Sequence, residues 1–456
     1  MRRRAHHKIP LVRLLASALL PALLLVITGC GSDPLVSPYP GTPTDSQRET
    51  LREMESRMAQ VRGLERLREV EYAFESRWSV ERAVDDYLRW GERDPVELDR
   101  IHQTQAVYEL LGFISPEDDV AEARARHLVS AAAFYAAPFN TVVVLGAPPG
   151  TSTEVILAHE FVHALQEQHF NVSDVLDNEV DSDADWEAEL AFRALIEGDA
   201  MVAEHQYARM SPDLRDPWAV AYYREHFREP PVAAYYREHA EAGYGPIPDA
   251  LQKEFHFPYE AGTAFVEALL AEGGWEAVND AYSRPPTTTE QVLHPDTYLA
   301  GEVGEVTELE QDITVGSVSG PWQLRGEPWF KSHGRLGEFL LRTYLEEELP
   351  KSEAASAAAG WGGDRWTFHT DYEEGNLLHL VIEWDSPAEL DEFYEAYLRW
   401  LEAASGGASE ALTADAALWH GPERSVYVSR RDGRATILIA SDRGASEEAR
   451  RKLGLP

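Results

Sequence analysis

Two histidines four residues apart enclose a glutamate in the stretch EVILAHEFVHALQEQHF, residues 154–170. On a helix, His159 and His163 lie one turn apart on one face, so both imidazoles can reach a single cation. Glu160 lies beside them, about 100° round the helix, where its carboxylate can accept a proton from an attacking water. The alternative is an amphipathic helix with a charged face, but the apolar flanks predict burial, and a buried unpaired glutamate is costly without a cation. The pattern therefore predicts a zinc hydrolase site, with Zn²⁺ as cofactor.

A third ligand can come from either of two places. His169 follows His159 by ten residues, but ten helical residues span about 15 Å, so the helix would have to bend. A glycine could supply that bend, and the residue at the required position is Gln166, a good helix former. Glu197 lies in a second predicted helix on a mostly apolar face, where a glutamate needs a partner. We therefore favour Glu197 as the third ligand and keep His169 as the alternative.

Three motifs resemble those of gluzincin-type zinc metallopeptidases, and more narrowly those of poorly characterised prokaryotic surface lipoproteins. They are HEFVHALQ (159–166), EGDA (197–200) and TTEQVLHP (288–295), and the likeness runs from about residue 61 to the segment AAGWGGDRW (358–366). The resemblance implies zinc bound by His159, His163 and Glu197, with Glu160 as the general base. It also implies that a peptide or a protein is the substrate.

The chain departs from this resemblance at one position of the second motif. Better-known gluzincins often have an aspartate four residues after the ligating glutamate, where it orients a metal-bound histidine, but Met201 stands there. Asp199 is the alternative for this role, although two positions along a helix point its side chain away from Glu197.

Peptide hydrolysis also needs a donor for the oxyanion that develops in the transition state, commonly a histidine or tyrosine from another segment. His294, in TTEQVLHP, is our first candidate for this further catalytic residue, and Tyr259 and His205 are the alternatives. His294 can equally be a core histidine beside Pro295. Glu290 in the same segment is expected to be a carboxylate at a helix start, because threonines precede it.

The first 47 residues are expected to direct and tether the protein rather than to fold. A basic start is followed by the apolar stretch LLASALLPALLLVITGC, which ends at the only cysteine, Cys30. This layout predicts a signal peptide over residues 1–29, and ITGC resembles the lipobox of prokaryotic lipoproteins, which implies membrane anchoring through a lipid on Cys30. An uncleaved anchor helix is the alternative, although the apolar run is just short of the roughly 20 residues that span a bilayer. Residues 30–47 are rich in Pro, Gly, Ser and Thr and predict a flexible tether.

Charge and composition narrow the class of partner. Acidic residues outnumber basic ones by 79 to 41, which gives a formal net charge of −38. An acidic surface of this kind disfavours nucleic acid and anionic lipid headgroups as partners. We expect an extracytoplasmic metallopeptidase that is lipid-anchored to the cell membrane, with a zincin-fold surface binding or structural lipoprotein of weak or no activity as the alternative. The sequence does not indicate an oligomeric state.

We expect an α+β fold whose first part, residues 48–300, is a mostly helical zincin-like metallopeptidase domain. Apolar residues recur at three- and four-residue spacing from Ser46 to about Gly112 and again up to Tyr282. The β-rich run Thr141–Leu145 interrupts this pattern just before the motif-bearing helix. We expect it to be a strand that holds extended substrate by edge pairing.

The second part, residues 301–456, is predicted to be a small α+β domain, because an acidic, turn-rich segment begins near Gly301 and helices and strands then alternate. The dipeptide Asp432-Gly433 predicts a hairpin turn. AAGWGGDRW is expected to be a structural turn with Asp364 as a helix cap. Helices are expected at 334–349 and 387–404, and strands at 365–372, 377–386 and 425–441.

Overall fold

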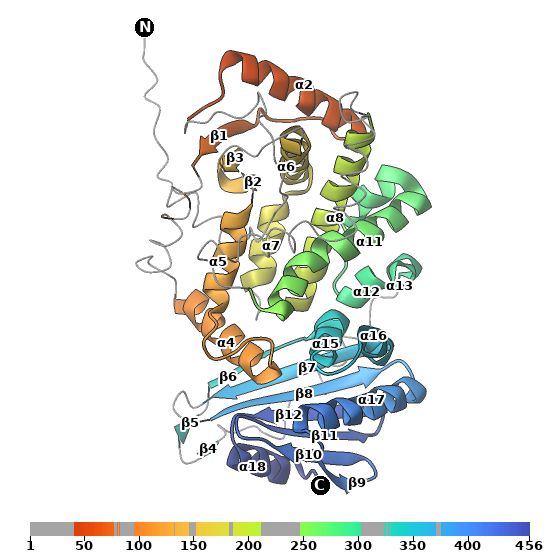
Figure 1. The fold of residues 1–456 in the computed structure, drawn as a ribbon. Helices are drawn as coiled ribbons and strands as arrows, with labels where there is room; N and C mark the ends of the chain where they lie inside the picture. The colour runs from red at the N-terminus through yellow and green to blue at the C-terminus, as the bar shows by residue number, and fades with distance from the viewer. Residues whose placement is uncertain are drawn as a thin grey trace.

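Helices dominate the chain up to residue 301 and an antiparallel sheet dominates beyond it, so the fold is α+β as predicted (Figure 1). The computed structural model describes residues 41–76, 80, 82, 95–131, 133–145, 152–181, 186–210, 247–301, 323–324, 327–328, 330–370 and 375–456. The predicted signal peptide, Cys30 and most of the tether lie outside these residues. Among the described helices, none combines the length and the apolar character needed to cross a membrane.

Helix α2 (Asp45–Arg62) begins three residues inside the segment predicted as tether, because local residues cap it. Thr44 and Gln47 form a reciprocal capping box at its start, and Gly63 ends it with φ 75°. Its buried apolar residues recur at three- and four-residue spacing and pack in one cluster with helix α6 (Ser152–Phe170). They are Leu51, Met54, Met58 and Val61.

A three-stranded sheet lies beside α2 and α6 (Figure 1). Strand β3 (Thr141–Leu145) is its central strand, which pairs in parallel with β1 (Glu71–Glu75) and antiparallel with β2 (Ala133–Ala136). The strand predicted at Thr141–Leu145 is therefore confirmed. The expectation that it offers an edge to substrate is wrong, because both of its edges are paired; β2 is the outer strand nearest in sequence to α6.

Strand β1 was expected to be helical. Its buried residues Tyr72 and Phe74 alternate with less buried ones, and Val70 before them continues the alternation. This period of two is the pattern of a half-buried strand. The parallel partner of β1 is separated from it by about 65 residues of sequence, so the pairing itself could not be read from the local pattern.

Helices α6 and α8 (Trp186–Met210) form the centre of the first part, and α11 (Asp249–Ala281) packs closely on α8. A methyl group built on Gly198 would lie 2.1 Å from the carbonyl oxygen of Gly262, so a side chain at this crossing would prevent the two backbones from approaching. The other described helices of this part are α4 (Pro95–Leu111), α5 (Val120–Ser130), η1 (Ala137–Phe139), α7 (Val172–Asp181), α12 (Thr289–Leu293) and α13 (Pro295–Ala300).

The C-terminal part is built on a seven-stranded antiparallel sheet with the strand order β6-β7-β8-β12-β11-β10-β9. The predicted hairpin is confirmed: β11 and β12 are joined by Asp432 and Gly433, whose φ angles are 52° and 82°. The strands are β6 (Phe330–Gly334), β7 (Trp361–Thr370), β8 (Asn376–Trp384), β9 (Glu410–Thr413), β10 (Ala416–His420), β11 (Ser425–Arg431) and β12 (Arg434–Ala440), with a separate pair β4 (Gln323–Leu324) and β5 (Glu327–Pro328). The helices are α15 (Gly337–Leu345), α16 (Lys351–Ala358), α17 (Pro387–Ser405) and α18 (Arg443–Leu453).

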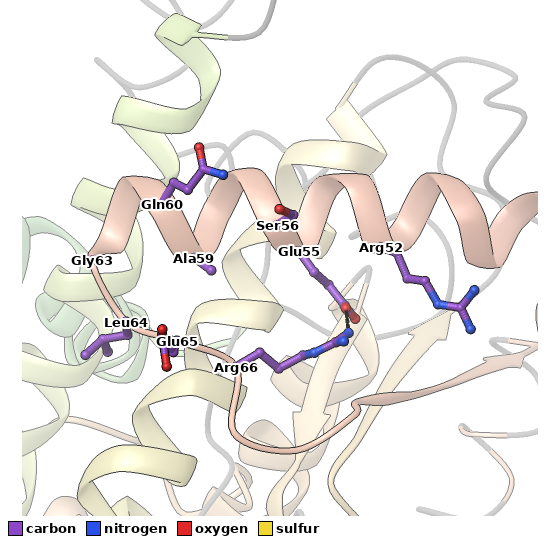
Figure 2. Close-up of a pocket in the computed structure, with 9 residues that line it drawn as sticks. All are labelled: Arg52, Glu55, Ser56, Ala59, Gln60, Gly63, Leu64, Glu65 and Arg66. Carbon is purple, nitrogen blue, oxygen red and sulfur yellow. Dashed lines mark hydrogen bonds and ion pairs between the residues drawn. The ribbon is translucent and has the colours of Figure 1, made fainter.

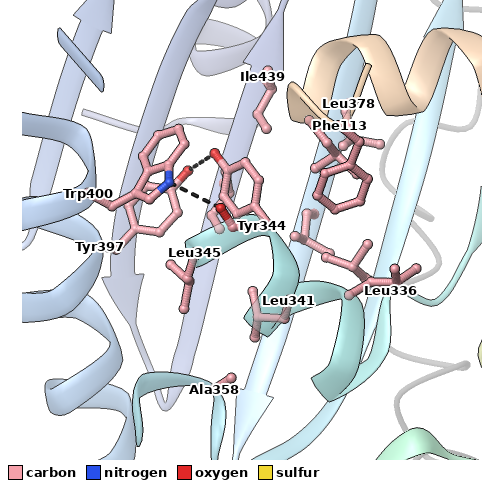
Figure 3. Close-up of a cluster of buried hydrophobic side chains, with 14 of the residues drawn as sticks. Phe113, Leu336, Leu341, Tyr344, Leu345, Ala358, Leu378, Tyr397, Trp400 and Ile439 are labelled. Atoms are coloured by element: carbon pink, nitrogen blue, oxygen red, sulfur yellow. Dashed lines mark hydrogen bonds between the residues drawn. The ribbon is translucent and has the colours of Figure 1, made fainter. Parts of the chain in front are cut away.

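Alternating residues of this sheet face two different hydrophobic clusters. In β12, Ile437 and Ile439 belong to the cluster under α15, α16 and α17, whereas Leu438 belongs to the cluster under α18. Figure 3 shows part of the first cluster, where Trp400 Nε1 donates to the carbonyl oxygen of Tyr344 at 3.2 Å. The helices therefore cover both faces of the sheet.

The larger of these clusters also contains residues from the first part of the chain. Leu111 of α4 and Leu251 and Phe255 of α11 are buried in the same cluster as the inward residues of the sheet. The segments predicted as separate domains, 48–300 and 301–456, thus share a hydrophobic core.

Candidate metal centre

The ligand candidates lie on two adjacent buried helices. His159, Glu160 and His163 project from α6, and Glu197 projects from α8. All four side chains are buried, because α6 is enclosed by α2, by α8 and by the three-stranded sheet. The alternative of a solvent-exposed charged face is therefore wrong, and the apolar flanks of the motif indicated its burial correctly.

The predicted ligand atoms converge on one point. Oε2 of Glu197 lies 3.4 Å from Nε2 of His159 and 3.7 Å from Nε2 of His163. Bonds of about 2.1 Å to a tetrahedral ion would place two ligand atoms about 3.4 Å apart. All three ligand atoms lie within 4.8 Å of one another, and no other such group occurs among the described residues.

These atoms also lack other partners. Within the described part of the chain, Nε2 of His159, Nε2 of His163 and both carboxylate oxygens of Glu197 accept or donate no hydrogen bond. The same holds for both oxygens of Glu160. Buried polar atoms are normally paired, because an unpaired one costs free energy. Two imidazole nitrogens and one carboxylate are a donor set that suits a divalent ion such as zinc, so the residues fit the predicted metal.

His159 is oriented by a carboxylate that the sequence analysis did not identify. Its Nδ1 donates to Oε2 of Glu204 at 2.9 Å, which leaves Nε2 to face Glu197. Glu204 follows Glu197 by seven residues, so the two lie on one face of α8, two turns apart. Met201, at the position where the resemblance leads one to expect an aspartate, is instead part of the hydrophobic core. The seven-residue spacing from Glu197 is the sequence signal by which Glu204 could have been found.

His163 is oriented by Gln166, the residue that replaces the bending glycine. Oε1 of Gln166 lies 2.8 Å from Nδ1 of His163, and Nε2 of Gln166 donates to the carbonyl oxygen of Ile196 at 2.9 Å and to Oδ2 of Asp199 at 3.0 Å. Because both partners of the amide nitrogen are acceptors, its oxygen must face His163 and accept the proton on Nδ1. Asp199 therefore acts on His163 indirectly, through Gln166.

The electrostatics of the centre favour positive charge between the imidazoles and the carboxylates. Burial lowers the pKa of His159, but the neighbouring carboxylates of Glu197 and Glu204 outweigh it and raise the pKa to about 10. Burial raises the pKa of Glu160 to about 8; the neighbouring His159 opposes this rise and Glu197 adds to it. Burial lowers the pKa of His163. A cation at this point would be attracted by the same carboxylates.

Comparison with known proteins gives a match only in the C-terminal part of the chain, away from the metal centre. Residues 328–450 match the model of a domain family of unknown function, DUF8575. The match spans 123 of 456 residues (450 − 328 + 1) and contains the seven-stranded sheet, whereas the ligand candidates lie outside it. No curated protein and no solved structure matches the chain.

The structure leaves His169 outside the group. Its Nε2 lies 2.7 Å from the carbonyl oxygen of Glu65, at the end of α6. The helix runs unbroken to Phe170, so the bend that a third histidine ligand requires is absent from α6. Of the two third-ligand alternatives, only Glu197 is brought to His159 and His163.

His294 is placed differently from our expectation. Its Nε2 lies 3.0 Å from Oε1 of Glu338 in α15, and 48% of its side chain is exposed. The TTEQVLHP segment meets α8 at its first turn, where the Thr289 hydroxyl donates to Glu187 at 2.9 Å. Glu187 precedes Glu197 by ten residues, which is about 15 Å along a helix. This placement does not support His294 as the oxyanion donor; the segment joins α8 to α15 instead.

The remaining candidates from the sequence are placed as follows. Tyr259 packs against the hydrophobic cluster that contains α6, and His205 follows Glu204 on α8, where burial lowers its pKa. Glu290 lies in the first turn of α12, which Thr288 caps, so its predicted place at a helix start is confirmed.

A pocket of about 510 Å³ lies along α2 and the turn that follows it (Figure 2). It is lined by residues between Arg52 and Arg66, including the ion pair of Glu55 with Arg66. None of the lining residues is a ligand candidate, so this pocket is separate from the metal centre.

Proposed function

We propose that this chain is a zinc-dependent metallopeptidase in which His159, His163 and Glu197 hold the ion and Glu160 is the general base. The observation that carries the proposal is the convergence of three buried ligand atoms that have no other partner in the described residues. Zinc, when bound, supplies Lewis-acid polarisation of the scissile carbonyl and an activated water.

Glu160 supplies the proton transfer. It is adjacent in sequence to one ligand, it is fully buried, and its two oxygens are unpaired in the described structure. Its carboxylate accepts a proton from the attacking water and then delivers it to the nitrogen of the leaving amine. Glu204 and Gln166 hold the proton of each histidine on Nδ1, so that both Nε2 atoms stay available as ligands.

The small sheet supports the substrate class. Strand β2 lies at the edge of that sheet, packs against α6 and is unpaired on its outer side among the described strands. The backbone of Tyr135 in β2 lies close enough to Glu160 to affect its pKa. We expect an extended peptide that pairs with β2 to pass Glu160. The lipobox-like ITGC supports a place outside the cell membrane, with the chain anchored through Cys30.

The test uses the purified chain, loaded with zinc and incubated with a mixture of unstructured peptides, with cleavage followed by mass spectrometry. We expect about one zinc per chain and cleavage of internal peptide bonds. Glu160→Gln should keep the zinc and lower the cleavage rate by about 10²- to 10⁴-fold, which is the usual contribution of a general base.

Two results would count against the proposal. Cleavage that persists unchanged in Glu160→Gln would assign it to another site or to a contaminant. Zinc bound at full stoichiometry without any cleavage would favour the alternative, a zinc-containing surface protein that binds or supports a partner.

A further inference from the structure

We propose that Arg62, which lies on α2 and touches no ligand candidate, is a positioning residue for the metal centre. It acts on His163 through Asp199 and Gln166. The inference rests on the proposed function, because it assumes that the cluster binds zinc.

The first step is the dependence of His163 on Gln166. The ring of His163 can present Nε2 to a metal only if Nδ1 carries the proton and the ring is held at a fixed rotation. Gln166 meets both needs, since its oxygen accepts from Nδ1 at 2.8 Å. The amide keeps this orientation only while its nitrogen has acceptors to bind, which are Asp199 and the carbonyl oxygen of Ile196.

The second step is the dependence of Asp199 on Arg62. Arg62 binds Asp199 with two nitrogens, Nε to Oδ1 and Nη2 to Oδ2, the latter at 3.0 Å. Both side chains are fully buried, and the hydroxyl of Tyr282 donates a hydrogen bond to Oδ2 of Asp199 at 2.8 Å. A buried carboxylate of this kind needs its paired cation, because removal of one partner leaves an uncompensated charge.

Arg62 is itself held rigidly, as a positioning group must be. Its Nη2 also donates to Oδ1 of Asn279 at 2.8 Å, and its guanidinium lies 4.4 Å from the centre of the Trp275 ring. The last turn of α2 and the end of α11 thus meet at Arg62. Three successive hydrogen-bonded contacts lead from Arg62 to His163, by way of Asp199 and Gln166.

The same helix offers a matched control. Glu55 precedes Arg62 by seven residues on α2, is 4% exposed, and pairs with Arg66 (Figure 2) and with the Tyr72 hydroxyl at 2.9 Å. This pair anchors α2 as the Arg62–Asp199 pair does, but none of these hydrogen bonds leads to a metal ligand. Loss of either pair should disturb the packing of α2, and only loss of the Arg62–Asp199 pair should disturb His163.

The test compares zinc affinity with stability in the full chain. The variants are Gln166→Leu, the charge-free pair Arg62→Met with Asp199→Leu, all three changes together, and the control pair Glu55→Leu with Arg66→Met. Zinc affinity is measured by competition with a chromophoric chelator, and the stability of the zinc-free protein by urea unfolding. Asp199→Asn, which keeps the side-chain shape but removes the negative charge that holds Arg62, is the second variant should the charge-free pair not fold.

We expect Gln166→Leu to weaken zinc binding by roughly 10- to 100-fold, as is usual for a partner that orients a ligand. The Arg62/Asp199 pair, or Asp199→Asn, should weaken it by about 10-fold. The triple variant should bind zinc like Gln166→Leu alone, because groups that act through one residue are not additive. The control pair should change stability and leave zinc affinity as in the parent chain.

Equal zinc affinity in the parent and in a folded Arg62/Asp199 or Asp199→Asn variant would overturn the inference. Fully additive losses in the triple variant would also overturn it, since Arg62 would then not act through Gln166. A parent chain that binds no zinc at all would instead overturn the proposed function on which the inference rests.

Discussion

Two buried carboxylates, one in each part of the molecule, differ in the number of donors around them. Asp364, 2% exposed in the C-terminal sheet, accepts from the backbone N–H groups of Leu336 and Gly337 at 2.7 Å each and from Trp361 Nε1 at 2.9 Å. Glu197, 1% exposed on α8, accepts no hydrogen bond within the described structure and faces two imidazole nitrogens.

The difference separates a structural carboxylate from a candidate metal ligand. Asp364 accepts from the backbone N–H groups at the start of α15, so it has its own set of donors and needs no further partner. It does so from strand β7, which includes Trp361–Trp366, so the turn expected over this part of AAGWGGDRW is wrong. Glu197 has been buried at similar cost but without donors, which is favourable only if something positive binds it.

Replacement of Glu197 by leucine should reduce zinc affinity by more than the roughly 100-fold upper bound for an orienting partner, because a ligand is lost. The stability of the zinc-free protein should not fall, since the change removes a buried carboxylate that has no donors. Chelator competition and urea unfolding measure the two quantities. An unchanged zinc affinity would remove Glu197 from the ligand set.

The titration of Asp364 should make the free energy of unfolding depend on pH. Burial raises its pKa from the usual 3.8 to about 6, against the opposing effect of its three donors. The folded state therefore holds the proton more tightly than the unfolded state, and the stability that this gives is complete below pH 3.8 and is lost as pH rises to about 6. A pKa difference of about 2 corresponds to about 3 kcal/mol.

The measurement is urea unfolding of the parent and of Asp364→Asn between pH 3.5 and about 7, a range that brackets both pKa values. The difference in unfolding free energy between the two proteins should decline by about 3 kcal/mol over this range. A flat difference would mean that Asp364 does not titrate there. Zinc affinity measured at pH 7 should be the same in both proteins.

Glu204→Gln tests the carboxylate that orients His159. The amide can still accept the proton on Nδ1 but carries no charge, so zinc affinity should fall by roughly 10- to 100-fold. Glu187→Gln is the matched control, because Glu187 is also buried on α8 but binds Thr289 rather than a ligand. Equal losses in the two variants would indicate a general effect of charge on α8.

The smallest effect is expected from His169→Ala. The change removes one hydrogen bond, to the carbonyl oxygen of Glu65, and should lower stability by no more than about 1 kcal/mol. Zinc affinity should stay at the parent value. A large loss of zinc would restore His169 as a ligand.

Features set by short-range patterns could be predicted from the sequence. The motif on α6 and the glutamate on an apolar face of α8 follow from the helical period, and the hairpin at Asp432 and Gly433 follows from turn chemistry. Glu204 was not predicted, although its seven-residue spacing from Glu197 obeys the same period, because the resemblance places the orienting carboxylate at the position of Met201.

Features set by contacts distant in sequence could not be predicted. Arg62 and Asp199 are 137 residues apart, and β1 pairs with a strand about 70 residues further on. The placement of His294 was likewise not predictable, because a histidine in a motif-like segment carries no sign of which face its segment presents. Its contact with Glu338 follows from the packing of α12 against α15, which the local sequence does not determine.

His159, His163 and Glu197 are proposed to hold one metal ion. Crystals of the zinc-loaded protein, measured on both sides of the zinc absorption edge, test this proposal most directly. We predict one strong anomalous peak at about 2.0–2.2 Å from Nε2 of each histidine and from a carboxylate oxygen of Glu197. A zinc peak elsewhere, or a loaded protein with no peak between α6 and α8, would exclude these three residues as the ligands.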